Sequence, residues 1–500
     1  MGPSVSETID ILVIGGGING AGLARDAAGR GLSVTVVEKA DLASATSSWS
    51  SKLIHGGLRY LEQYEFSLVR EALREREVLL RLAPHIIRPL LFVLPHDASM
   101  RPTWMIRAGL WLYDHLGGRI TLPGSKAVAF PHIEFSAGLK GDFRSGFVYS
   151  DCRVDDSRLT IVNAMSAREK GATVLTRTRF ERARRIDGEW EVEIADASGA
   201  KRMLRAHALV NAAGPWVMDV LDRVDGDKIK GRVRLVKGSH IIVPKVHAQR
   251  HAMLLQNPDK RVVFVIPYEG RFSLIGTTDV AVPSVEAAAS ISEAETDYLL
   301  AAANRFLAKP LTRADVVTSY AGVRPLYDDG SDNPSEVTRD FVLRLDHEAN
   351  RAPLVTIFGG KITTYRRLAE EVMDRLAPFF PGLKGRWTAT ETLPGGNVAH
   401  FNAFRDEMQS QYSKLGRELI EGVVRRHGHR TTKVLGEAAR LEDLGRYFGA
   451  GLTEREVEYL RAEEWAVSAE DILWRRTKCG LHMTEGERKA VEQYMAVVPA

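Results

Sequence analysis

Glycines spaced to approach a phosphate lie near the start of the chain. The pattern G-x-G-x-x-G is filled by Gly15, Gly17 and Gly20, directly after the apolar run 9–14. The first glycine makes a tight turn, the second lets the backbone approach a pyrophosphate, and the third lets a helix pack closely on the strand. Glu38 follows Gly20 by eighteen residues. A carboxylate there accepts hydrogen bonds from ribose hydroxyls, so the pattern predicts a dinucleotide site.

A run of hydroxyl side chains, and then of cations, follows the second strand. Residues 46–61 read TSSWSSKLIHGGLRYL, where an NAD-binding fold would continue into another strand and helix. Hydroxyls here suit the pyrophosphate and ribitol of FAD, and a second glycine turn, FGGKITTYRR at 358–367, supplies another helix N-terminus. Its positive end suits negative charge on a reduced flavin. We therefore expect FAD as the cofactor.

The elements that position these residues interleave along the chain. Strand, glycine turn, helix and strand fill 9–38, mostly strand patterns fill 232–282, and helical patterns fill almost everything after 398. The predicted fold is an α/β Rossmann-like FAD-binding domain with an interleaved antiparallel-β substrate domain and an all-α C-terminal domain. The expected boundaries are 1–83, 151–231 and 320–385 for the FAD-binding domain, 84–150 and 232–319 for the substrate domain, and 386–500 for the helical cap.

Composition narrows the class of protein. Of the 500 residues 44% are apolar and 26% charged, as in ordinary globular proteins. Cys152 and Cys479 are the two cysteines, too few for a disulfide framework, and a reducing compartment is expected. No metal is expected, because Asp155 and Asp156 lack partners at ligand spacing. Neither a signal peptide nor an apolar stretch of about 18 residues is found, so no membrane span is expected.

Nine short motifs occur in a fixed order along nearly the whole chain. They are IGGGINGAG, ATSSWSSKLIHGGLRYL, YSDCRVDDSRL, VNAAGPWV, KGSHIIVP, RVVFVIPY, IGTTD, GVRPL and FGGKITTYR. In this order the sequence resembles the aerobic, FAD-dependent glycerol-3-phosphate dehydrogenases, within the wider D-amino-acid-oxidase-like flavoproteins. The resemblance implies oxidation of sn-glycerol 3-phosphate to dihydroxyacetone phosphate, with hydride transfer from C2 to flavin N5 and electrons passed to a membrane quinone.

The resemblance also places the family's functional positions on residues of suitable chemistry. Those expected to contact FAD are Gly15, Gly17, Ile18, Asn19, Gly20, Glu38, Thr46, Ser47, Ser48, Ser51, Lys52, Leu53, His55, Gly214, Gly359, Gly360, Lys361 and Thr363. Those expected to bind the substrate are Arg59, Tyr60, Thr278, Arg324 and Lys361. The cations among them suit a phosphate dianion, and the hydroxyls suit a polyol.

Two histidines are candidates for the base that takes the proton of the C2 hydroxyl. Imidazole suits this step because its pKa lies near neutrality. His240 is favoured over His55, because the alternation of its strand points it to one face, where Gly238 leaves space. Arg324 is always protonated, so it is expected to stabilise the developing alkoxide instead.

Plainer interpretations remain open for the same residues. Arg324 precedes a proline and suits an ion pair in a turn, and Lys361 suits a cap of the preceding sheet. His55 suits contact with flavin without proton chemistry, and His240 suits a buried core position. Five further histidines are interpreted as surface residues: His132, His247, His251, His427 and His429.

The segment RPTWMIRAGLWLYDHL, residues 101–116, has the composition of a helix in the lipid headgroup layer. As a helix it gathers apolar side chains between two arginines, and that combination favours an interface. The face holds Trp104, Met105, Ala108, Trp111 and Leu112. The alternative is a core helix under the substrate site. The basic runs 425–433 and 474–478 are expected to add attraction to anionic lipid.

The expected partners are glycerol 3-phosphate, ubiquinone or menaquinone, and anionic lipid, with the oligomeric state open and a homodimer among the options. The expected location is cytoplasmic, at the inner face of the cell membrane. Two other functions stay open. A soluble oxidase would reduce oxygen, although such relatives tend to carry an insertion that is not found here. An FAD-bearing RNA-binding protein is compatible with the pI of about 8.9. No basic-aromatic module is found, however, so no nucleic acid is expected.

Overall fold

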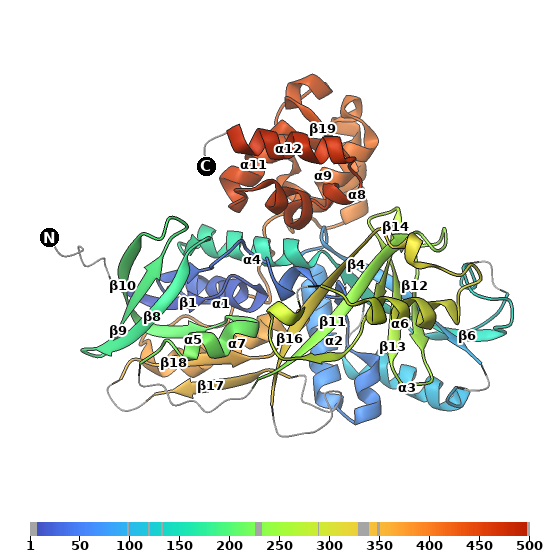
Figure 1. Cartoon of the computed structure of the whole chain (residues 1–500), viewed down its shortest axis with the longest axis horizontal. Helices are drawn as coiled ribbons and strands as arrows, with labels where there is room; N and C mark the ends of the chain where they lie inside the picture. Colours follow the sequence, from blue (N-terminus) through green and yellow to red (C-terminus); the bar gives the residue numbers. More distant parts are fainter. Residues whose placement is uncertain are drawn as a thin grey trace.

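Two β-sheets lie side by side, and a helical C-terminal domain sits above them (Figure 1). The computed structural model describes residues 8–97, 100–118, 121–131, 134–225, 233–288, 290–328, 340–347 and 351–497. No helix in these ranges is both long and apolar enough to cross a bilayer.

The first sheet is the predicted dinucleotide-binding sheet. Its strands run in the order β17-β18-β10-β1-β2-β7, and the β8–β9 hairpin extends it from β10. The bounds are β1 (Ile9–Ile14), β2 (Val34–Val37), β7 (Thr173–Leu175), β8 (Arg179–Ile186), β9 (Glu189–Ala195), β10 (Lys201–Asn211), β17 (Val342–Asp346) and β18 (Leu354–Phe358). β1 pairs in parallel with β2 and β10. Its apolar side chains are buried on both faces, as expected for a central parallel strand.

Helices cover the first sheet. They are α1 (Ile18–Gly29), α4 (Asp156–Glu169), α5 (Val217–Leu221) and α7 (Tyr365–Leu376). α1 packs against both α4 and α7, and their apolar side chains share one hydrophobic core with β1 and β2. The local pattern of strand, glycine turn and helix is therefore the one predicted.

The second sheet is almost entirely antiparallel. Its strands run in the order β15-β11-β14-β13-β12-β4-β6-β3, with β16 paired to β11 and β5 paired to β6. The bounds are β3 (Leu53–Ile54), β4 (Ile87–His96), β5 (Lys126–Ala129), β6 (Ser145–Val154), β11 (Val233–Pro244), β12 (Ala252–Gln256), β13 (Val262–Tyr268), β14 (Phe272–Gly276), β15 (Val280–Val282) and β16 (Thr318–Tyr327). Three helices flank it: α2 (Phe66–Leu82), α3 (Thr103–Leu116) and α6 (Glu293–Asn304).

Two of the predicted domain boundaries cut through strands. The boundary at 151 falls inside β6 and the one at 320 falls inside β16, whereas both strands belong wholly to the second sheet. β3 belongs there too, although it was expected within the first domain. The reason is long-range pairing: β16 lies along β11 over ten residue pairs.

The C-terminal domain has a hydrophobic core of its own. Its elements are α8 (Phe401–Gln411), α9 (Arg417–His427), α10 (Thr431–Leu435), α11 (Glu454–Glu464), α12 (Glu485–Val497), a π-helical turn (Asp471–Arg476) and the short strands β19 (Tyr447–Gly449) and β20 (Leu452–Thr453). The domain is thus helical apart from one two-stranded ribbon. α4 contacts both α11 and the π-helical turn, and it is one of the elements through which the domain meets the remainder of the molecule.

The helix α3 lies at the end of the molecule away from the C-terminal domain (Figure 1). Its inner face is part of the core, where Leu110 and Tyr113 are buried. Its outer face presents Trp104, Met105 and Trp111, which are 67%, 41% and 61% exposed. Neither of the two predicted environments, the lipid headgroup layer or the protein core, describes the whole helix. One face is core, and the other is an exposed aromatic surface.

Candidate active site

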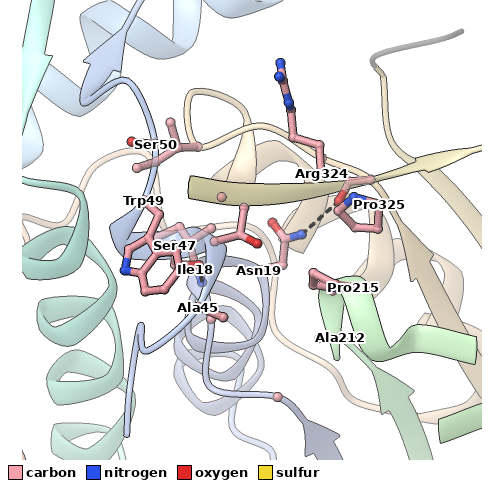
Figure 2. Close-up of a pocket in the computed structure, with 18 of the residues that line it drawn as sticks. Ile18, Asn19, Ala45, Ser47, Trp49, Ser50, Ala212, Pro215, Arg324 and Pro325 are labelled. Carbon is pink, nitrogen blue, oxygen red and sulfur yellow. Dashed lines mark hydrogen bonds between the residues drawn. The ribbon is translucent and has the colours of Figure 1, made fainter. Parts of the chain in front are cut away.

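A cavity of about 420 Å³ lies where the carboxyl ends of β1 and β10 meet β11 and β16 of the second sheet. Its wall comes from distant parts of the chain: the first turn of α1, the hydroxyl-rich segment, the end of β10 and the turn before α7. Figure 2 shows Ile18 and Asn19 of α1 facing Pro215 on one side and Ser47 on the other. The carboxyl edge of a parallel sheet is the usual ligand site in such folds.

The glycine turn places the N-terminus of α1 against this cavity. Gly15 has φ +113°, and a Cβ there would lie 2.5 Å from the Ala212 carbonyl oxygen, so only glycine fits. Gly20 does not line the cavity, so its expected contact with FAD is not found there. A Cβ at Gly20 would lie 1.9 Å from the Gly15 oxygen, so this glycine lets α1 pack against the turn. The Ile18 amide donates to Ser47 Oγ at 2.9 Å. The N-terminus of this helix and the Ser47 hydroxyl together suit a phosphate.

Glu38 lies in the same wall at the end of β2. Its carboxylate accepts the amides of Gly16 and Ala40 at 2.7 and 2.8 Å. Burial raises the pKa of Glu38, and these two hydrogen bonds oppose the rise. A carboxylate has further lone pairs, so acceptors remain for a ribose. Beside it, Lys39 Nζ lies 3.5 Å from the centre of the Trp216 ring.

The hydroxyl-rich segment divides between two tasks. Thr46, Ser47 and Ser51 lie in the cavity wall. Ser48 is buried and donates to the Ala45 oxygen, and Lys52 Nζ lies 2.8 Å from Asp156 Oδ1. The expected cofactor contacts of Ser48 and Lys52 are therefore not found in this wall, because both side chains brace the segment from behind.

The turn before α7 completes the dinucleotide part of the cavity. Gly359 and Gly360 have φ of +73° and +97°, and both lie in the wall with Thr363. Asn19 Nδ2 donates to the Gly359 oxygen at 3.2 Å, while Asn19 Oδ1 is buried with no partner in the part of the chain that the structure describes. An unpaired acceptor beside two helix N-termini fits a ligand with hydroxyls and phosphates, as FAD has. The remaining predicted contacts, Leu53, His55 and Gly214, also line the cavity.

Another part of the wall combines a cation with a phenol. Lys361 Nζ lies 4.0 Å from the centre of the Tyr60 ring, and both residues face the cavity. The amide of His55 donates to Thr363 Oγ1 at 3.4 Å, which ties this corner to the glycine turn. Burial lowers the pKa of His55, so its imidazole is neutral.

Arg324 reaches the cavity from β16, with its side chain directed away from Asn19 (Figure 2). Its Nη2 donates to Asp279 Oδ1 at 2.6 Å and to the Thr278 oxygen at 3.1 Å. A Cβ on Gly238 would lie 2.7 Å from Nη2, so the glycine leaves room for the guanidinium. Arg324 is therefore both paired with an acid, as the plainer interpretation had it, and part of the wall.

His240 is buried in the wall, 3% exposed. Its Nε2 lies 2.9 Å from Ser51 Oγ, its ring stacks on Tyr320 at 4.9 Å, and its Nδ1 has no hydrogen-bond partner among the described residues. Burial, with the charges of Lys52 and Arg324, lowers the pKa of His240 to about 3. Without ligands the imidazole is therefore neutral, and its pKa lies well below the value near neutrality that was expected.

Two predicted substrate residues do not line the cavity. Thr278 is buried, where its hydroxyl donates to Glu295 Oε1 at 2.9 Å and accepts the Ser239 amide at 3.0 Å. Its neighbour Thr277 takes the place in the wall. Arg59 lies in a short 3-10 helix outside the wall. Neither Thr278 nor Arg59 is part of the proposed substrate site.

Sequence reasoning missed several residues of the wall. They are Lys39, Trp49, Arg179, Trp216, Arg223 and Thr277. The tryptophans lay inside motifs already recognised, and their position was the available signal. Arg179 and Arg223 had no such signal in the sequence, because β8 and the turn after α5 reach the cavity only through tertiary packing.

Several predicted surface groups are in fact buried. His247 and His251 stack on each other at 4.4 Å, and His427 lies 2.8 Å from Glu456 Oε1. His429 is exposed as predicted, and His132 lies outside the described residues. No group that could hold a metal ion is found in the described ranges.

The basic runs do not form the free positive surface that was expected. In 425–433, Arg425, Arg426, Arg430 and Lys433 pair with Glu421, Glu456, Glu169 and Glu463. In 474–478, Arg475 and Arg476 pair with Asp41, and Lys478 pairs with Asp155. The pairs of Arg430, Arg475, Arg476 and Lys478 join the C-terminal domain to the remainder of the molecule, and the other three pairs lie within it. Because each of these cations has an acidic partner, we do not propose that the basic runs bind anionic lipid.

Comparisons with known proteins agree with this geometry. Residues 10–366 match the family described as FAD dependent oxidoreductase, and residues 386–499 match the C-terminal domain of alpha-glycerophosphate oxidase. The chain is 54% identical to a D-erythritol 1-phosphate dehydrogenase of Brucella abortus, over 98% of both chains. It is 52% identical to a glycerol-3-phosphate dehydrogenase of Pseudomonas aeruginosa, over 98% of this chain and 96% of that one.

Among solved structures, the chain is similar to the glycerol-3-phosphate dehydrogenase from Bacillus halodurans complexed with FAD. The TM-score is 0.76 at 27% identity, with 98% of this chain and 94% of that chain covered. Together with the family matches, this confirms the predicted cofactor and fold class. The chain is similar to glycerol-3-phosphate dehydrogenases and has the C-terminal domain of alpha-glycerophosphate oxidase. It therefore belongs to the family of FAD dependent oxidoreductases.

Proposed function

We propose that the protein oxidises sn-glycerol 3-phosphate to dihydroxyacetone phosphate and passes the electrons to a membrane quinone. The observation that carries the proposal is the group of Tyr60, His240, Arg324 and Lys361 in one cavity with the FAD-binding pattern. Two cations beside a hydroxyl and an imidazole suit a phosphorylated polyol. The relative from Pseudomonas aeruginosa, named for that substrate, supports the choice.

Each side chain has a role that follows from its chemistry. Lys361 supplies positive charge for the phosphate, and Tyr60 holds a substrate oxygen. Arg324 stabilises the developing alkoxide, and the neutral imidazole of His240 accepts the proton of the C2 hydroxyl. A phosphate dianion nearby raises the pKa of His240, because it stabilises the imidazolium. FAD, which the glycine turns at Gly15 and Gly359 would hold, would supply the hydride acceptor.

The test is anaerobic mixing of the yellow protein with glycerol 3-phosphate. We expect the flavin absorbance to bleach, and a quinone to restore it faster than oxygen does. Faster return with oxygen would favour the soluble oxidase. Absence of bleaching would contradict the proposed substrate.

A second substrate is favoured by one observation. The relative from Brucella abortus, at 54% identity, is named for D-erythritol 1-phosphate, which shares the phosphate monoester and a secondary hydroxyl but has one more carbon. The ratio of kcat/KM for the two substrates decides between them. We expect glycerol 3-phosphate to be preferred, and a preference for the four-carbon substrate would reassign the site.

We predict that FAD is bound without a covalent link. The buried Cys152 and Cys479 lie outside the cavity wall, and neither His55 nor His240 lies in a recognised attachment motif. Acid precipitation should leave the yellow colour in the supernatant. Colour that stays in the pellet would contradict this prediction.

The pH dependence tests the state of His240. A base must be deprotonated to act, and with a pKa of about 3 in the free protein His240 is protonated only at low pH. The ratio of wild-type to His240→Asn kcat/KM should therefore stay constant from pH 8 down to about pH 5, since kcat/KM reports the free enzyme. The ratio cancels the titration of the substrate phosphate. A fall in this ratio centred near pH 6.5 would show that His240 titrates normally.

A further inference from the structure

The C-terminal domain reaches the cofactor site through buried charges. Arg475 Nε and Arg476 Nη2 lie 2.6 and 2.8 Å from the carboxylate of Asp41, which is 3% exposed. Asp41 follows Glu38 by three residues and begins the stretch 41–52, which we call the cofactor segment. Arg177 strengthens the same contact, because it pairs with Asp471 at 2.5 Å while its amide donates to the Ala40 oxygen at 2.8 Å.

A second set of contacts holds the other end of the cofactor segment. Lys478 Nζ pairs with Asp155 Oδ1 at the N-terminus of α4. The adjacent Asp156, fully buried, accepts Lys52 Nζ at 2.8 Å and Ser50 Oγ at 2.7 Å. Two neighbouring aspartates thus join the C-terminal domain on one side to the cofactor segment on the other.

Between these two ends lie the side chains that face the cavity. Thr46, Ser47 and Ser51 all belong to the cofactor segment, and Ser51 Oγ lies 2.9 Å from His240 Nε2. The Tyr320 hydroxyl donates to the Ser50 oxygen at 2.7 Å, and the same ring stacks on His240. A small shift at either end of the segment therefore moves the hydroxyls that surround the ligand.

We propose that Arg475, Arg476 and Lys478, here named the C-terminal clamp, position the cofactor segment for FAD from outside the cavity. None of the three lines the cavity wall. The C-terminal domain then sets the affinity for FAD, and the environment of the flavin, without touching either. The inference rests on the assignment of the cofactor segment to FAD, and it needs no particular substrate.

The test must remove the clamp without leaving a bare buried charge. Loss of one partner of a buried ion pair is strongly destabilising, whereas removal of both charges is often tolerated. The variant Asp41→Asn with Arg476→Gln removes both ion pairs at Asp41, while Arg475 keeps its pairs with Glu470 and Asp471. The matched control is Arg158→Gln with Glu464→Gln. This buried pair joins α4 to α11, with Arg158 Nη2 3.0 Å from Glu464 Oε1, and its side chains make no hydrogen bond to the cofactor segment.

The readouts are FAD affinity and flavin spectra in the full-length protein. Apoprotein is titrated with FAD, and the dissociation constant is read from the quenching of flavin fluorescence. We expect it to rise about tenfold or more in Asp41→Asn with Arg476→Gln, as for the loss of one hydrogen bond to a charged group. The flavin circular dichroism band and midpoint potential should shift with it. The control should leave all three unchanged while it lowers Tm comparably.

Equal changes of FAD affinity in the two pair variants, at equal loss of Tm, would overturn the proposal, because the clamp would then only dock a domain. The single variant Arg476→Lys keeps the charge opposite Asp41, so it should retain most of the wild-type affinity for FAD. If the Asp41 variant does not fold, Asp155→Asn with Lys478→Gln applies the same test from the other end, since asparagine still caps α4. Bleaching of the wild type by glycerol 3-phosphate is measured separately, so a wrong substrate and a wrong clamp give different results.

Discussion

Replacement of Arg324 by alanine is expected to lower kcat/KM for glycerol 3-phosphate by about 10- to 150-fold, while FAD stays bound. The reason is loss of one hydrogen bond from a charged group to the reacting substrate, about 1.5–3 kcal/mol. Arg324 lies in the wall beside Gly238 and Thr277, apart from the glycine turns that suit the dinucleotide. Flavin content and steady-state kinetics are measured on the same preparation.

The control is Arg344→Ala. Arg344 is an exposed arginine on β17 that donates to the Tyr327 hydroxyl, and it does not line the cavity. Its loss should leave kcat/KM unchanged. Asp279→Asn should give a smaller loss than Arg324→Ala, because the guanidinium remains but loses the partner that orients it. Normal kinetics of Arg324→Ala with full flavin content would remove Arg324 from the substrate site.

Replacement of Trp104, Met105 and Trp111 together by serine is expected to release the protein from lipid vesicles. Burial of each apolar side chain contributes about 1.5–3 kcal/mol, so the loss of three lowers the partition constant by about a thousandfold or more. Co-sedimentation with vesicles measures this. Leu110 must be left intact, because it is buried in the core and its loss would disturb folding.

Two assays on the same variant separate an anchor from a structural defect. Bleaching by glycerol 3-phosphate and transfer to a water-soluble dye should stay normal, whereas activity with a long-tailed quinone in vesicles should fall. The matched control replaces three exposed apolar residues of the C-terminal domain, Tyr447, Val467 and Trp474, by serine. If the α3 variant still pellets with lipid, or the control is released instead, the anchor lies elsewhere.

The parts of the site that follow one another in sequence were predictable. β1, its glycine turn, α1 and Glu38 form within thirty residues, and local periodicity and turn chemistry determine them. The same holds for the turn at Gly359, since its strand and helix adjoin it. Membership of a sheet was harder, because β3, β6 and β16 pair with strands far away in the chain.

Predictions for single side chains failed where a strand ends, or where an ion pair joins residues far apart in the sequence. Alternation stops at Gly276, the last residue of β14, so it did not distinguish Thr277 from Thr278. Arg475 and Arg476 were predicted to lie on a basic surface, because their partner Asp41 lies 434 and 435 residues earlier in the sequence. A buried cation and an exposed one look alike in sequence until the partner is found.

That separation of 434 residues also sets an order of events during synthesis. Asp41 leaves the ribosome early, and at about 5–20 residues per second its arginine partners follow roughly 20–90 s later. During that interval the first glycine turn and α1 can form, but the carboxylate beside them still has only water as its partner. If the C-terminal clamp positions the cofactor segment as proposed, the nascent chain completes its cofactor pocket last, after residue 478 has emerged. Cells in which translation stops before this point would accumulate chains that carry every residue of the cavity wall and still retain FAD poorly.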